Sequence, residues 1–227
     1  MYFVKPIFFE FEPVKISNVT ENGSVKTELA RFIALYEKQC LLEILGECLY
    51  KELIDSYELL SGATELTLKT NASEPIKRLV NGYSYTAPQN DGSDYDWSLS
   101  FWLGGCGCGC GSSTCTTRVW QGFVKTDNYL IGGAVRESKS SFIAGYIYYH
   151  YLLINRSITT ASGQQVLTGE NSTTVSNFSK RIDCYNEFIF SVVGKQNQTS
   201  LYRFLQDNKA NYPTWKRNCN LTFKTKY

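Results

Sequence analysis

The chain has 227 residues and a net charge of +2, with 43% hydrophobic and 15% aromatic residues. This length is enough for one or two domains with a hydrophobic core, and the aromatic content excludes a disordered chain. The near-neutral charge disfavours a protein that coats DNA, and the single histidine leaves little room for a histidine-based catalytic or metal site, so we expect a folded protein that is not an enzyme.

Residues 1–26 are expected to form an extended arm. Four phenylalanines and two prolines disfavour a helix there, and Asn22-Gly23 is a turn signal. Such an arm would form a strand or lie on a neighbouring protein.

Two helices are expected in residues 27–82. Apolar residues recur at three- and four-residue steps, which predicts a long helix from a Thr27 cap to Ser61-Gly62. Gly46 lies in the middle of this helix, where it is expected to kink or divide it. A shorter helix is expected over 73–80, because a serine can cap its start and a proline suits its first turn.

Residues 83–133 show no helical period and are expected to be a long irregular insertion. They contain three of the four tryptophans, Trp97, Trp102 and Trp120, and more than half of the glycines. An irregular stretch of this length is usually functional or disordered rather than an ordinary connection.

Helical periodicity returns at about Arg136. A helix from there to Leu153 would be apolar or aromatic nearly all round, so it is expected to be buried among neighbours or in an interface. Three further elements are expected after it: a turn or small hairpin at 159–165, a long helix at 172–193 and a short helix at 199–208.

We therefore predict a mainly α fold. It would be a helical bundle with extended N- and C-terminal arms and one long irregular insertion that contains glycine, cysteine and tryptophan. The expected boundaries are 1–26 for the first arm, 27–82 and 134–208 for the two parts of the bundle, 83–133 for the insertion and 209–227 for the tail.

No segment is expected to cross a membrane or to act as a signal peptide. The most apolar uncharged run, residues 140–155, has 16 residues, whereas about 20 are needed to span a bilayer. The first residues lack a continuous apolar run, because Lys5, Glu10 and Glu12 interrupt it. We expect a soluble protein that is made in the cytosol.

The sharpest local motif is a cysteine cluster in the insertion. Cys106, Cys108, Cys110 and Cys115 lie among glycines and could supply four thiolates to a tetrahedral zinc ion, although this spacing departs from the usual cysteine pairs. Two alternatives are disulfides or cross-links formed outside the cell, and a glycine-rich loop of reduced thiols. Apart from this zinc, no cofactor is expected.

Other polar residues give weaker signals. His150 lies in an apolar helix without an evident partner, so it is expected to be a packed core residue rather than a base. Asp91, Asp94 and Asp96 suggest calcium ligands but lack the spacing and the final glutamate of an EF-hand, so a solvated turn is the better interpretation. The sequence contains no phosphate-binding loop and no nucleophile elbow.

One ordered set of short segments is more specific than these motifs. The segments are Leu35-Tyr36-Glu37-Lys38, Leu41-Leu42-Glu43-Ile44-Leu45-Gly46, Leu49-Tyr50-Lys51-Glu52, Ile143-Ala144-Gly145-Tyr146-Ile147-Tyr148-Tyr149, Thr159-Thr160-Ala161-Ser162-Gly163, Glu170-Asn171 and Lys180 to Asn186. Over about residues 27–193 their order resembles the head–tail connector, or neck ring, proteins of tailed phages, especially the crAss-like phages and related prophages of gut bacteria. The cysteine and glycine insertion is not expected in the core of that family.

The resemblance implies a structural virion protein. In that family a helical bundle forms a ring of about a dozen copies beneath the portal, and DNA passes through its centre. The implied partners are therefore copies of the same chain, the portal protein, other neck or tail rings and the genomic double-stranded DNA, with no membrane partner. The protein would be synthesised in the host cytoplasm and located in the neck of the virion. A near-neutral charge suits a channel through which DNA slides, since each phosphate contact adds affinity.

An obligate oligomer also needs apolar surface to bury between subunits. Five aromatic residues are candidates for that interface: Trp97, Trp102, Trp120, Tyr146 and Tyr149. Two other classes of protein stay open. Eight cysteines and eight Asn-X-Ser/Thr triplets would suit an extracellular disulfide-bonded glycoprotein or adhesin, and the cysteine cluster would suit a zinc-stabilised binding module.

Overall fold

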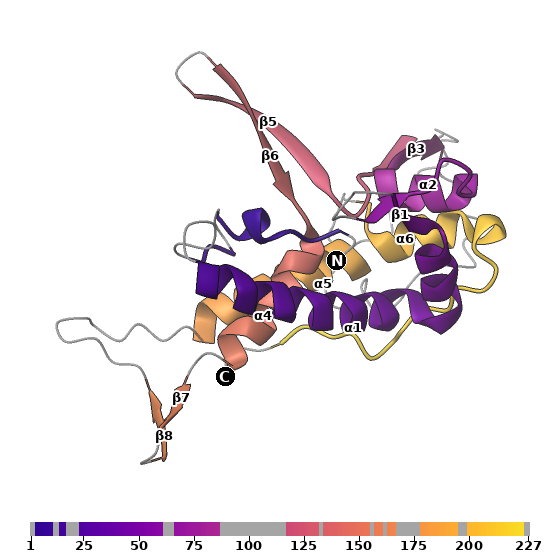
Figure 1. The fold of residues 1–227 in the computed structure, drawn as a ribbon. Helices are drawn as coiled ribbons and strands as arrows, with labels where there is room; N and C mark the ends of the chain where they lie inside the picture. The colour runs from indigo at the N-terminus through magenta and orange to yellow at the C-terminus, as the bar shows by residue number, and fades with distance from the viewer. Residues whose placement is uncertain are drawn as a thin grey trace, which may run out of the picture.

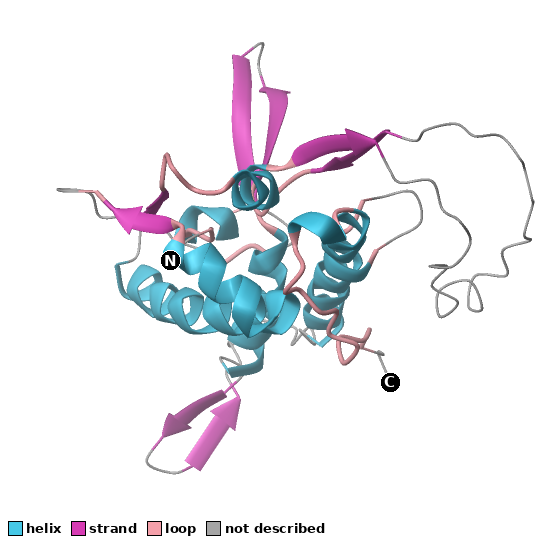
Figure 2. Ribbon diagram, turned by 90° about the vertical axis from the view of Figure 1, so that its right-hand side faces the viewer, coloured by secondary structure: helices cyan, strands magenta, loops and turns pink. Residues whose placement is uncertain are grey.

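The computed structural model describes ten stretches of the chain. They are residues 3–10, 14–16, 23–60, 66–86, 117–131, 134–154, 157–160, 163–166, 178–194 and 199–224. Over these residues the fold is mainly α, with five α-helices and four two-stranded antiparallel sheets. The helices cluster in the centre, and the hairpins radiate from them (Figure 1 and Figure 2).

The longest helix, α1 (Gly23–Asp55), is sharply bent at Gly46 (Figure 1). Gly46 has φ 74° and ψ 166°, a combination that is practically restricted to glycine. The predicted kink is therefore confirmed. The predicted end at Ser61-Gly62 is wrong, because the chain leaves the helix after Asp55 and forms strand β1 (Tyr57–Leu59), which pairs with β2 (Leu66–Leu68).

Helix α4 (Phe142–Ile154) packs against both α1 and α5 (Phe178–Val193). This position buries the first half of a helix that is apolar nearly all round, as the sequence predicted, whereas Leu153 and Ile154 at its end are exposed. The predicted start at Arg136 is wrong, because Ala134–Ser140 is strand β6 and pairs with β5 (Lys125–Ile131). Polar and charged residues dominate β6, so this stretch suits an exposed ribbon better than a buried helix.

The insertion predicted at 83–133 is not irregular at its two ends. Strand β3 (Tyr83–Thr86) pairs with β4 (Thr117–Trp120), so the residues that flank the stretch 87–116 lie side by side. Residues 87–116 lie outside the described part of the chain. Ahead of β3, the predicted short helix is confirmed as α2 (Glu74–Asn81), although the hydroxyl of Ser73 makes no capping hydrogen bond.

The remaining predicted elements are confirmed with shifted ends. A hairpin is formed by β7 (Ser157–Thr160) and β8 (Gly163–Val166). Helix α5 is followed by Gly194, which has a φ of 127°, and α6 spans Leu201–Asp207. A short 3₁₀ helix, η2 (Lys209–Asn211), leads into the tail.

The first residues of the chain pack on their own core rather than on a neighbour. Residues 3–10 include a 3₁₀ helix, η1 (Pro6–Phe9), and bury two further side chains before it, Phe3 and Val4. The Phe3 N–H donates to the buried carboxylate of Glu37 at 2.6 Å. The expectation of an arm lying on another protein is therefore corrected for these residues.

The tail supplies hydrogen bonds to the bend of α1. An interrupted helix leaves carbonyls without intrahelical N–H partners. The indole of Trp215 donates to the Ile44 carbonyl at 3.2 Å, and the side-chain amide of Asn218 donates to the Glu43 carbonyl at 3.0 Å. Trp215 is buried, so the tail forms a strap across α1 rather than a free extension.

The division of the chain into an arm, two bundle parts, an insertion and a tail stays a prediction.

Among the described helices, none combines the length and the apolar character that a membrane span requires.

Candidate functional site

The structure separates the sequence-predicted interface residues into two groups. Trp120, Tyr146 and Tyr149 lie in the described part of the chain, whereas Trp97 and Trp102 lie outside it.

Trp120 is a core residue. Its side chain is 4% exposed, and its indole N–H donates to the Leu79 carbonyl at 2.8 Å. The ring stacks on Phe204 with 5.7 Å between centroids and meets Phe123 edge-on at 6.3 Å. The chain itself therefore covers most of this ring, and an interface role for Trp120 stays a prediction.

The two tyrosines of α4 differ in exposure. Tyr146 is buried, and its hydroxyl donates to Glu43 Oε1 at 3.0 Å. Tyr149 is half-buried, with its ring 4.9 Å from that of Tyr185 and the Lys224 ammonium 5.1 Å from its centre. Tyr146 thus packs in the core of its own chain, and interface roles for both tyrosines stay predictions.

His150 packs between aromatic rings. It stacks on Tyr36 at 4.2 Å, with 13° between the planes, and lies 4.7 Å from the ring of Tyr146. Burial lowers the pKa of His150 to about 4, and the positive charge of Lys224 contributes. The imidazole is therefore neutral at pH 7, as a packed aromatic ring would be.

We expect this histidine to make stability pH-dependent. The folded pKa is below the value of about 6.5 in an unfolded chain, so the neutral ring contributes fully above pH 6.5 and loses its contribution as the pH falls toward 4. When the pH is lowered from 7.5 to 5, the free energy of unfolding of His150→Phe should fall by about 1 kcal/mol less than that of the wild type. This value already includes a reduction for the partial solvent exposure of the ring. Urea unfolding at the two pH values measures the difference. Equal losses in both proteins would contradict the assignment.

The hairpin β5–β6 stands away from the helices (Figure 1). Exposed ion pairs lie on it between Lys125 and Asp127 at 2.9 Å and between Lys139 and Glu137 at 3.1 Å. A two-stranded hairpin has little stability of its own. This ribbon therefore offers exposed backbone and charged side chains away from the helical core.

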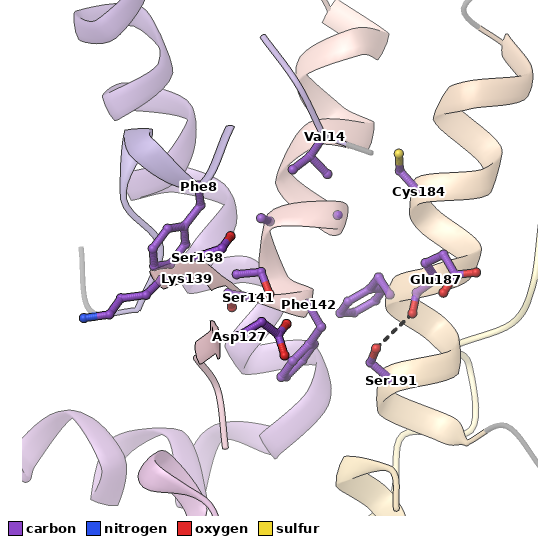
Figure 3. Close-up of a pocket in the computed structure, with 14 residues that line it drawn as sticks. Phe8, Val14, Asp127, Ser138, Lys139, Ser141, Phe142, Cys184, Glu187 and Ser191 are labelled. Atoms are coloured by element: carbon purple, nitrogen blue, oxygen red, sulfur yellow. Dashed lines mark hydrogen bonds between the residues drawn. The ribbon is translucent and has the colours of Figure 1, made fainter. Parts of the chain in front are cut away.

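A small cavity lies at the foot of this hairpin (Figure 3). Its volume is about 290 Å³, and η1, the hairpin, α4 and α5 contribute to its wall. Phe8 and Phe142 supply apolar surface, and Asp127 and Glu187 supply carboxylates. The described residues that line it include no histidine, and the Ser191 hydroxyl donates to the backbone carbonyl of Glu187 at 3.1 Å rather than to a base. The arrangement offers no activated nucleophile.

A buried carboxylate joins three elements on another side of the core. Asp207 of α6 has a side chain that is 4% exposed. It accepts hydrogen bonds from the Tyr85 hydroxyl of β3 at 2.9 Å and from Arg118 of β4, and it pairs with Arg203 Nε at 3.2 Å. Burial, followed by the nearby Asp207 charge, raises the pKa of Tyr85. The sequence analysis missed this network, since only the four-residue spacing of Arg203 and Asp207 was visible along the chain.

The candidate zinc ligands lie outside the described residues, namely Cys106, Cys108, Cys110 and Cys115. In the described part of the chain, no group of three or more potential ligands is close enough to hold a metal ion. The four described cysteines are free thiols, of which Cys40 and Cys184 are buried. Burial raises the pKa of Cys40 well above its usual value, so this thiol stays protonated.

Comparison of the chain with protein-family models, with curated proteins and with solved structures finds no match.

Proposed function

We propose that the protein is a structural virion protein, a subunit of a head–tail connector or adaptor ring that docks on the portal and lines the channel through which DNA leaves the head. The proposal rests on the order of the resembling segments in the sequence and on the packing of the helices that contain them. It includes the finer description of the fold as a helical bundle with arms and an insertion.

One observation carries the proposal: the helices that contain the resembling segments pack together. Residues 35–52 lie in α1, residues 143–149 in α4 and residues 180–186 in α5. α4 contacts both of the others. Segments that are far apart in the sequence, and whose order suggested the family, thus contribute to one core rather than to separate units.

The positions of two hairpins support the other part of the proposed function, which is assembly into a ring. β5–β6 and β7–β8 extend from different sides of the helical core (Figure 2). Ring subunits contact two neighbours through different surfaces, which is a heterologous arrangement. Projecting ribbons on different sides of a subunit suit such contacts.

The proposed partners follow from the connector function. They are about a dozen copies of the same chain, the portal protein, other neck or tail rings and the passing double-stranded DNA, in the neck of a virion assembled in the host cytoplasm. No cofactor and no membrane partner are part of this function. We also propose that the insertion with Cys106–Cys115, Trp97 and Trp102 contacts a neighbouring virion protein, because large apolar side chains favour interfaces.

Deletion of the gene from its phage or prophage tests the proposal. Filled heads without attached tails are expected, because a neck ring joins the two parts of the particle. Antibody labelling of wild-type particles in electron micrographs should mark the junction of head and tail. Normal tailed particles from the deletion strain, or labelling confined to the host envelope, would contradict the proposal.

A further inference from the structure

A broad groove runs along the foot of β5–β6 and has a volume of about 1000 Å³. Its wall comes from β4, the link to β5, the start of α4, the end of α5 and α6. The lining residues are Thr117, Arg118, Val119, Trp120, Gln121, Gly122, Phe123, Lys125, Ser140, Ser141, Phe142, Phe190, Ser191, Thr199 and Arg203. The groove adjoins the smaller cavity of Figure 3, and the two share Ser140, Ser141, Phe142 and Ser191.

The charge of the groove is one-sided. Three cationic side chains line it, those of Arg118, Lys125 and Arg203, and none of the described lining residues is acidic. The Lys125 ammonium pairs with Asp127 at 2.9 Å between half-exposed side chains, and such surface pairs contribute little and exchange readily. An anionic group entering the groove therefore meets positive charge.

Arg118 is held in place before any ligand arrives. The buried Asp207 carboxylate accepts a hydrogen bond from this guanidinium, whose side chain remains 25% exposed. A guanidinium has five N–H donors in a fixed plane, so one carboxylate cannot occupy all of them. A fixed cation binds an anion with less loss of side-chain entropy than a mobile one.

The groove also has polar and apolar features that a simple counter-ion does not need. The Ser141 residue is 8% exposed, and its buried hydroxyl has no hydrogen-bond partner among the described atoms. It immediately precedes α4, whose N-terminal end carries partial positive charge. Beside it lie aromatic rings, Phe142 and Phe190, and the exposed Val119.

We propose that this groove binds an acidic, aromatic peptide segment, residues Asp91 to Trp97 of a second copy of the chain. This segment contains three aspartates, Tyr95 and Trp97 within seven residues. Its carboxylates would pair with the groove cations, and its aromatic rings would cover the apolar wall. The inference rests on the proposed ring function, because a contact between a groove and a different surface of the next copy is the head-to-tail type that closes rings.

The mixture of charge and apolar surface favours a peptide over other anions. A free phosphate would leave the aromatic wall of a 1000 Å³ groove uncovered. Duplex DNA gains affinity mainly from many phosphate contacts, whereas this groove is concave and its described lining offers three cations. The Asp91–Trp97 segment combines both kinds of chemistry and occurs in every copy of the chain.

A labelled peptide of residues 90–98 tests the site directly. Its binding is measured by fluorescence anisotropy to the full chain in which Asp91, Asp94 and Asp96 are replaced by Asn, so that the receptor carries no competing segment. Lys125→Glu and Arg118→Gln in this receptor should each weaken binding about fivefold or more. The same peptide with Asn in place of its aspartates should bind correspondingly weakly.

Lys139→Glu is the matched control. Lys139 is as exposed as Lys125, lies on the same hairpin and also pairs with a carboxylate two residues away. It faces Thr126 in the ladder, so its side chain points to the opposite face from that of Lys125. This change should alter binding less than about twofold. Equal effects of Lys125→Glu and Lys139→Glu, or displacement of the peptide by inorganic phosphate or a short DNA duplex, would overturn the proposal.

Mixing two variants tests the contact between copies. At concentrations near the Kd of the peptide, the wild type should form oligomers, whereas Lys125→Glu chains and chains with the three Asn replacements should each be mostly monomeric. A mixture of the two should stop at dimers, because only one intact groove and one intact segment can meet. A monomeric wild type, including one whose segment closes its own groove, would overturn the proposal. Peptide binding without virion incorporation would instead refute the connector function alone.

Discussion

Replacing Trp120 with alanine is expected to lower the free energy of unfolding by about 3 to 5 kcal/mol, the usual cost of removing a large aromatic ring from a core. The indole is 4% exposed and touches the rings of Phe123, Phe142 and Phe204. Its removal would also leave the Leu79 carbonyl without the N–H that now reaches it. Urea unfolding followed by far-ultraviolet circular dichroism measures the change.

Trp120→Phe separates the two contributions. It keeps an aromatic ring but loses the hydrogen bond to Leu79, so it should cost about 1 to 2 kcal/mol. If Trp120→Ala lowers the free energy of unfolding by less than the value expected for Trp120→Phe, Trp120 does not form part of the core. That result would favour its assignment to a subunit interface.

Gly145→Ala is expected to destabilise the protein by about 1 to 3 kcal/mol, although alanine favours a helix by about 1 kcal/mol over glycine. The reason is the close approach of α4 and α5. A Cβ at Gly145 would lie 2.8 Å from the Cys184 carbonyl oxygen, which belongs to the backbone of α5 and cannot rotate away. The two helices would have to separate, and the contacts between Tyr146 and Phe188 would weaken.

Gly23→Ala provides the matched control, since Gly23 is also helical and a Cβ there meets nothing within 4 Å. It should leave the melting temperature unchanged or raise it slightly. A Gly145→Ala variant that gains stability like Gly23→Ala would show that the helices are not in backbone contact at this point.

The sequence predicted those elements whose signals are local. The helical period, the proline in the first turn of α2 and the glycine at 194 each act within a few residues, so α1, α2, α5 and α6 were found. Gly46 was recognised as a kink because glycine alone reaches its backbone conformation. The position of the bend in α1 thus follows from a residue within the helix, whereas the tail that hydrogen-bonds to it comes from the far end of the chain.

Other features depend on partners far away in the sequence. Thr117–Trp120 became a strand because it pairs with Tyr83–Thr86 across 30 intervening residues. Trp120 looked like an interface anchor because its cover comes from α2, α4 and α6, and no local pattern shows that cover. Arg136 lies in strand β6, whose pairing with β5 overrides the predicted start of the helix, and the helix begins only at Phe142.

The candidate binding groove was beyond sequence reasoning for the same reason. Arg118, Lys125 and Arg203 belong to three different elements, and their neighbours along the chain give no hint of a shared surface. The cluster of Asp91, Asp94 and Asp96 is evident from the sequence. A binding partner for these carboxylates can be proposed only from the structure, which brings the cations together in one groove.

The strap across α1 sets the order in which the chain can finish folding. Trp215 donates to Ile44 across 171 positions of sequence. At the usual rate of protein synthesis, about 5 to 20 residues per second, the ribosome needs roughly 10 to 30 s to cover that distance. The hydrogen bonds at the bend therefore cannot form until the tail has been synthesised, and a nascent chain that is released early lacks these donors. Only completed chains would acquire the full hydrogen bonding at the bend, so prematurely terminated products would lack this stabilisation of α1.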